Sequence, residues 1–181
     1  MDQMTDRRAI AVWEAAGAVF IILAGSALHF VFAWSGQPRP IAWLAAVNES
    51  TWEHFKLAFW PALLFALVEL PFLKKRTGNF WTAKAAGLWA MPVVIGAVFY
   101  AYRAVWGRNF LWADILLFVV AVCAGQAASF RILTAPPQPR PRRRLAYFAL
   151  ALLFLAFALL TYFPPKIFLF ADPRNGGYGI L

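Results

Sequence analysis

Residues 145–163 read LAYFALALLFLAFALLTYF and contain no charged side chain. A membrane-spanning α-helix needs about 20 consecutive, mostly apolar residues, and this stretch meets that need. Four other stretches are similarly apolar, although each includes one or more polar residues: 9–32, 56–73, 80–102 and 110–133. The sequence therefore predicts an all-α polytopic membrane protein with about five transmembrane helices.

The composition of the whole chain agrees with this fold class. Of the 181 residues, 62% are hydrophobic and 14% are charged, whereas a soluble domain is nearer half apolar and a quarter charged. We expect a single membrane domain over 1–181, with a C-terminal tail at 164–181. The sequence has no Gly-rich phosphate loop, CxxC pair, GxSxG or HExxH, so it lacks the common motifs for nucleotide binding and soluble hydrolysis.

The positive charge of the chain is distributed like a membrane topology signal. The net charge is +9, but the basic residues lie between the apolar stretches and do not form one stripe, which argues against a nucleic-acid partner. With the N-terminus inside, 11 of the 17 Lys and Arg residues fall on the inner side. The positive-inside rule then predicts a multi-pass protein of the cell membrane, with its N-terminus cytoplasmic and its C-terminus outside.

The segment between the first two spans is too long for a tight turn. Its apolar part, IAWLAAV at 41–47, predicts a short interfacial or re-entrant helix before the second span. Ser50 and Glu53 have the spacing of a capping box, which indicates that the second helix begins there. Pro61 predicts a kink about one turn deeper.

Polar residues gather on one predicted side of the membrane. His29 lies near the outer end of the first span, and a dense polar motif stands at the entrance of the second. Charged groups at membrane depth are costly unless they are paired or hydrated, so this one-sided cluster predicts an outward-facing polar pocket. The residues expected to line it are His29, Asn48, Glu49, Ser50, Glu53, His54, Lys56, Arg103, Asp114, Asp172 and Tyr178.

The side-chain types in this cluster suit a divalent metal such as zinc. The chain has only two histidines, so a third ligand would be a carboxylate, as in His₂Glu zinc sites. We expect His29, His54 and either Glu49 or Asp114 as metal ligands. Glu53 and His54 are the candidate catalytic residues, with Glu53 as general base. The favoured function is a metal-dependent enzyme acting on a lipid-like substrate at the outer leaflet.

The motif itself resembles an uncharacterised family of small prokaryotic membrane proteins. The string NESTWEHFK at 48–56, followed by Phe59 and Pro61, is similar to the N-E-S-x-W-E-H-x-K motif of that family at the start of a transmembrane helix. The tail is also similar, with Asp-Pro at 172–173 and Gly-Tyr-Gly at 177–179. The resemblance covers the whole chain in length and layout and implies no activity. It adds weight to five site residues, Glu49, Glu53, His54, Asp172 and Tyr178.

Two other functions fit the same residues. The interrupted entry to the second span favours a binding or transport protein for a small solute, for which a homodimer is expected. A scaffold or partner subunit is the other reading. In a scaffold, Ser50 caps a helix, Lys56 extends to the interface and Arg103 pairs with Asp114.

The acidic residues toward the inner side can be explained without a chemical role. Glu14 and Glu69 lie toward the inner ends of their helices, and Glu69 is close in sequence to Lys74, Lys75 and Arg76. We therefore expect ordinary charge compensation there. Gln126, near the middle of the fourth span, is expected to form an interhelical hydrogen bond.

Overall fold

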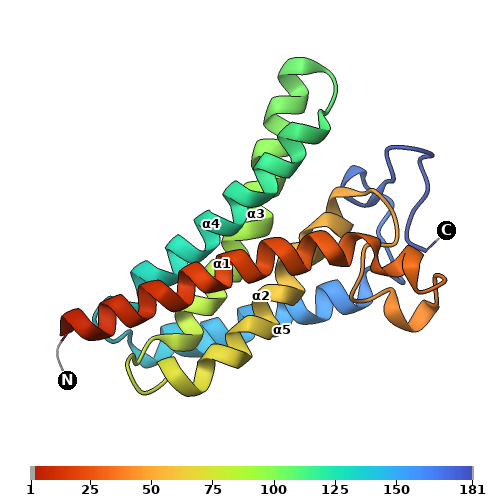
Figure 1. The fold of residues 1–181 in the computed structure, drawn as a ribbon. Helices are drawn as coiled ribbons and strands as arrows, with labels where there is room; N and C mark the ends of the chain where they lie inside the picture. The colour runs from red at the N-terminus through yellow and green to blue at the C-terminus, as the bar shows by residue number, and fades with distance from the viewer. Residues whose placement is uncertain (1–2, 181) are drawn as a thin grey trace.

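The fold is taken from a computed structural model that describes residues 3–180. Within these residues the chain forms five α-helices, two short 3₁₀ helices and no named strand, as the all-α prediction requires (Figure 1). The elements are α1 (Gln3–Trp34), η1 (Arg39–Ile41), α2 (Thr51–Leu73), α3 (Phe80–Trp106), α4 (Leu111–Leu133), α5 (Arg140–Leu159) and η2 (Phe168–Phe170).

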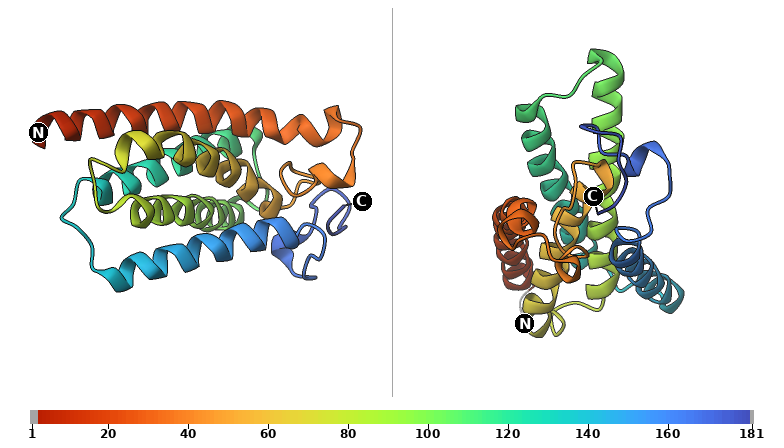
Figure 2. Two further views of the ribbon diagram at one scale, coloured as in Figure 1. Left: turned by 90° about the horizontal axis from the view of Figure 1, so that it is seen from below. Right: turned by 90° about the vertical axis from the view of Figure 1, so that its right-hand side faces the viewer.

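Helix α2 lies at the centre of the bundle. It packs against α1 and α3, while α4 packs against α3 and α1, and α5 packs against α3 (Figures 1 and 2). Phe59 of α2, Met91 of α3 and Val122 of α4 are almost fully buried in the shared core. The start of α1 and the tail after η2 lie at opposite ends of the bundle (Figure 2).

Four helices have the length and apolar composition needed to cross a membrane. Large apolar side chains such as Leu64, Val93 and Ile115 are exposed on their surfaces, as expected where lipid replaces water. The protein is therefore a multi-pass helical membrane protein, and the bilayer is its partner. The spans are Asp6–Trp34, Thr51–Leu73, Phe80–Trp106 and Leu111–Leu133.

The fifth long helix differs from the predicted span 145–163. Helix α5 begins at Arg140, with a proline in its first turn, and ends at Leu159. Proline is compatible with the first turn of a helix because the amide that it lacks has no partner there. The arginine run before Leu145 is consequently helical, and α5 is not among the four candidate spans found in the described residues.

The connection between α1 and α2 is folded back against the bundle. Gly36 and Gln37 have positive φ angles of 82° and 60°, and they reverse the chain after α1. The expected helix over 41–47 is limited to the single 3₁₀ turn η1 and the hydrogen-bonded turns that follow it. Ala42 and Ala45 are fully buried and pack with Phe32. Their carbonyl oxygens accept hydrogen bonds from Lys56 of α2.

The close crossing of α1 and α2 depends on Gly25. A Cβ atom added there would overlap the carbonyl oxygen of Leu57 and lie 2.7 Å from Cζ of Phe118. We expect Gly25→Ala to lower the free energy of unfolding by about 1–3 kcal/mol, the usual cost of overpacking. Denaturant titration in detergent micelles measures this, with Gly78→Ala as the control because its nearest neighbour would be 3.7 Å away. Equal stability of the two variants would contradict the close approach.

Candidate functional site

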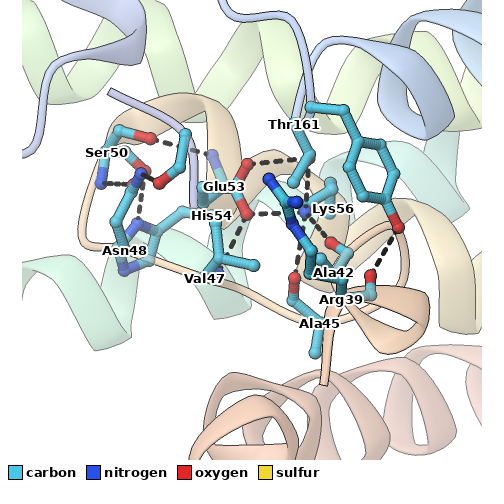
Figure 3. A network of polar contacts seen from close by, with 12 residues as sticks. Arg39, Ala42, Ala45, Val47, Asn48, Ser50, Glu53, His54, Lys56 and Thr161 are labelled. Atoms are coloured by element: carbon cyan, nitrogen blue, oxygen red, sulfur yellow. Dashed lines mark hydrogen bonds and ion pairs between the residues drawn. The ribbon is translucent and has the colours of Figure 1, made fainter. Parts of the chain in front are cut away.

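The site end of the bundle is built around the first turn of α2. Ser50 is the N-cap, and its side chain accepts a hydrogen bond from the Glu53 amide, which confirms the predicted cap. The second half of the capping box is replaced, because the Ser50 amide donates to Asn48 Oδ1 at 2.9 Å (Figure 3). The Glu53 carboxylate is thereby left to bind elsewhere.

Lys56 is fully buried beneath this turn. Its Nζ lies 2.6 Å from Glu53 Oε2 and donates to the carbonyl oxygens of Ala42 and Ala45 at 2.8 and 2.9 Å (Figure 3). It also donates to Thr161 Oγ1 at 2.7 Å. The expectation that Lys56 extends to the membrane interface is wrong, because four oxygen atoms hold its ammonium group inside the bundle.

Both carboxylate oxygens of Glu53 are occupied in the same network. Oε2 accepts from the Val47 amide at 3.0 Å and pairs with Lys56, and Oε1 accepts from Thr161 Oγ1 at 2.9 Å. The side chain is 2% exposed. The predicted general base is therefore bonded on each oxygen atom and lies in a structural ion pair.

A second group of polar side chains lies beside this network. His29 of α1, Glu49 before α2 and His54 of α2 each offer one ligand atom, and these three atoms lie within 4.8 Å of one another. Glu49 Oε1 is 3.8 Å from His29 Nε2, and Glu49 Oε2 is 3.6 Å from His54 Nε2. The two ring centroids are 5.4 Å apart. These three side chains are called the His–Glu cluster below.

The orientation of the His54 ring is fixed by its other nitrogen. Nδ1 lies 2.8 Å from the Ser50 carbonyl oxygen, which can only accept, so Nδ1 carries the hydrogen (Figure 3). Nε2 is the nitrogen that remains for a metal, and it faces Glu49. This is the bond that metal-ligating histidines characteristically make through their second nitrogen. The Nδ1 atom of His29 is buried and has no hydrogen-bond partner.

Glu49 owes its position to the chain before the helix. It precedes the N-cap Ser50, so it lies outside α2 and is not on the helical face that carries Glu53 and Lys56. Its carboxylate also pairs with Arg174 of the tail, whose Nη2 lies 3.1 Å from Glu49 Oε1. Arg174 is mostly exposed, so a cationic group stands at the open side of the His–Glu cluster.

The C-terminal tail is docked against the same motif. Asn48 Nδ2 donates to the Gly179 carbonyl at 2.8 Å, and Asp172 Oδ2 lies 3.5 Å from the Glu49 amide. Asp172 Oδ1 accepts from the Arg174 amide, so this residue shapes the tail. Tyr178 pairs with Ala171 in an isolated β-bridge. Asn48, Ser50 and Asp172 therefore hold backbone in place around the cluster.

Two of the expected pocket residues lie elsewhere. Asp114 accepts hydrogen bonds from Asn109 and Tyr102, and the Arg103 guanidinium stands over the Phe99 ring. The tip of the α3–α4 hairpin projects away from the rest of the bundle (Figure 1). Asp114 is thus outside the His–Glu cluster, and no ion pair joins it to Arg103 among residues 3–180.

The inner end of the bundle contains a polar group that sequence reasoning did not identify. Glu69 pairs with Lys84 of α3, and not with the basic residues that follow α2. Lys84 also pairs with Glu14 of α1. Gln126 donates to the Glu14 carbonyl, as expected of an interhelical contact. A lysine one turn into the third span, with two glutamates in other spans, was the available signal.

The chain belongs to the family described as "Family of unknown function (DUF6512)", whose family model matches residues 2–180. This agrees with the resemblance to an uncharacterised family that covers the whole chain. Comparison with curated proteins gave no significant match, and comparison with solved structures gave none either.

Proposed function

We propose that this member of the family is a metal-binding membrane protein whose site is the His–Glu cluster, and that the metal serves a reaction on a lipid-like substrate. One observation carries the proposal. Two imidazoles and one carboxylate, contributed by α1 and by the start of α2, place three ligand atoms within 4.8 Å of one another. Small movements of these side chains would bring all three onto one ion.

The donor set favours a zinc-like ion. Two nitrogen ligands and one carboxylate oxygen are the set of His₂Glu sites, in which a fourth position stays open for water or substrate. The cluster is accessible, because the His54 side chain is 36% exposed. The hydrogen bond from His54 Nδ1 to the Ser50 carbonyl supports this assignment, since such outer bonds orient ligating rings.

The surroundings favour a substrate with an anionic group. Arg174 stands beside Glu49, and an arginine can bind a phosphate or carboxylate through two parallel hydrogen bonds. We place this end of the bundle outside the cytoplasm, because 11 of the 17 Lys and Arg residues lie on the other side in that orientation. The cluster then lies at the depth of the lipid headgroups of the outer leaflet. A bound metal would supply an activated water there. Glu53 is not available as its general base, because both of its carboxylate oxygens are occupied.

Metal binding is tested with purified protein, zinc and three variants. We expect one zinc per chain, and we expect His29→Ala and His54→Ala each to weaken binding by more than the roughly 10- to 100-fold that outer-shell changes cost. Asp114→Asn is the matched control, because Asp114 lies outside the cluster, and it should bind zinc as the parent does. Isothermal titration and elemental analysis measure both effects. Unchanged zinc affinity in both histidine variants would refute the site.

The reaction is tested separately from metal binding. Protein loaded with zinc is incubated in vesicles of natural phospholipids, beside chelator-treated protein and His54→Ala, and the lipids are analysed by mass spectrometry. We expect a change in lipid composition that requires both the metal and His54. If zinc binds and no lipid changes, the catalytic part fails and the metal-binding part stands.

A small-solute binding protein is the second candidate. It is favoured by a groove of about 400 Å³ near the tail, lined by Arg39, Tyr162 and Tyr178 among others. A homodimer would be the natural transporting unit for so small a chain. Solute flux into proteoliposomes that depends on Tyr178 and survives loss of the histidines would favour this function over the first.

A further inference from the structure

Lys84 of α3 is held between two glutamates in the inner half of the bundle. Its Nζ lies 2.5 Å from Glu14 Oε1 and also pairs with Glu69 Oε1. All three side chains are at most 5% exposed. They come from three different spans. They therefore meet through the packing of the helices, and not through a motif in one stretch of sequence.

The remaining contacts of this triad leave two oxygen atoms without a partner. Ser129 Oγ donates to Glu14 Oε1 at 3.1 Å, and Gln126 Nε2 donates to the Glu14 backbone carbonyl at 3.0 Å. Glu14 Oε2 and Glu69 Oε2 are buried and accept no hydrogen bond. An unpartnered polar atom in such surroundings is costly, so these two oxygens need an explanation.

Charge counting identifies what is missing. Two ionised carboxylates around one ammonium give the triad a net charge of −1. Helix α4 contributes only the neutral Ser129 and Gln126 to it, and among the described residues no further charged side chain contacts it. Burying an uncompensated charge is strongly unfavourable, so the triad requires one additional positive charge.

We propose that the Glu14–Lys84–Glu69 triad is a proton-binding site, in which one of the two unpartnered carboxylate oxygens carries a single proton. The neutral triad then contains one ammonium, one carboxylate and one carboxylic acid. Geometry favours a proton over a metal cation. The adjoining cavity has a volume of about 10 Å³, near the minimum for a single water, and a cation would need several further oxygen ligands.

The position of the triad distinguishes it from the His–Glu cluster. Glu14 and His29 lie on the same helix, and 15 residues at 1.5 Å each separate them by about 22 Å. An ionisable group that exchanges a proton at membrane depth is the kind of group used in proton relays. The triad is therefore a second functional site, and the test of proton binding there does not depend on the test of metal binding at the His–Glu cluster.

Infrared spectroscopy of the full-length protein in lipid tests the proposal directly. We expect the C=O band of a protonated carboxylic acid at neutral pH, shifted in D₂O. The band should be lost in Glu14→Gln and also in Glu69→Gln, because each change leaves one carboxylate paired with one ammonium. Asp6→Asn is the control, since Asp6 forms a surface pair with Arg76, and the band should persist in it. No band in the parent protein, or a band that survives in either glutamine variant, would overturn the proposal. A band that appears only after Na⁺ is withdrawn would also overturn it, because a cation would then occupy the site.

Stability against pH gives a second readout. A proton that is bound in the folded state and absent from the unfolded state makes the protein less stable as pH rises. Over the pH range in which the folded protein holds this proton and the unfolded chain does not, the unfolding equilibrium constant should rise by about tenfold per pH unit. Each glutamine variant should also remove this dependence. The same pH slope in either variant as in the parent would contradict the assignment.

Discussion

Lys56→Met should lower the free energy of unfolding by about 3–5 kcal/mol, which is enough to prevent folding of a marginally stable chain. The substitution leaves the Glu53 carboxylate buried without its counter-ion. It also removes the donor for two carbonyl groups of the connection between α1 and α2. Denaturant titration in micelles, followed by tryptophan fluorescence, measures the loss.

Two further variants separate charge from packing. Lys74→Met changes an exposed lysine at the end of α2 and should alter stability by no more than about 0.5 kcal/mol. The double variant Glu53→Gln with Lys56→Met should recover part of the loss, because it replaces the unpaired, buried Glu53 carboxylate with a neutral amide. If Lys56→Met is as stable as Lys74→Met, the buried network does not hold this end together.

Lys84→Met should have a destabilising effect of similar size, about 3–5 kcal/mol at neutral pH, because it leaves two buried carboxyl groups, one of them ionised, without a cation. Acidification should restore stability, since the remaining carboxylate becomes neutral once it takes up a proton. A series of unfolding titrations from neutral to acidic pH measures this recovery.

The matched controls for Lys84→Met are a surface lysine and a neutralised triad. Lys75→Met changes an exposed side chain and should show neither the loss nor the recovery at acidic pH. Combining Lys84→Met with Glu14→Gln and Glu69→Gln should remove most of the penalty at neutral pH. A loss that is independent of pH would indicate a packing defect and not an electrostatic one.

The positions of the helices follow largely from hydropathy and capping. The end of α2 at Leu73 and the start of α3 at Phe80 agree with the predicted spans, because a basic loop interrupts the apolar run there. Ser50 marks the start of α2 by its chemistry. The start of α5 is different, because a proline and several arginines are compatible with a first helical turn, and hydropathy does not register that turn.

Depth in the membrane, as read from the sequence, predicts the positions of some site residues and not of others. His29 and His54 were expected at one depth, and the structure brings their rings together. The Glu53 carboxylate does not cap α2, because Asn48 Oδ1 accepts the hydrogen bond from the Ser50 amide in its place. Residue spacing alone does not predict which of these two side chains accepts that bond. Lys84 was missed because its partners lie on other helices, and the rotation of each helix about its axis is set by packing.

The hydrogen bond between Asn48 and Gly179 joins residues separated by 131 positions in the chain. During synthesis, the Asn48 side-chain amide reaches its acceptor only after nearly all of the remaining polypeptide has been made. Lys56 can contact Ala42, Ala45 and Glu53 early, but its contact with Thr161 also forms late. Contacts between distant positions form slowly, since a large loop must close first. We therefore expect docking of the tail to be the step that closes this end of the bundle, because Thr161 and Gly179 complete the contacts at the start of α2.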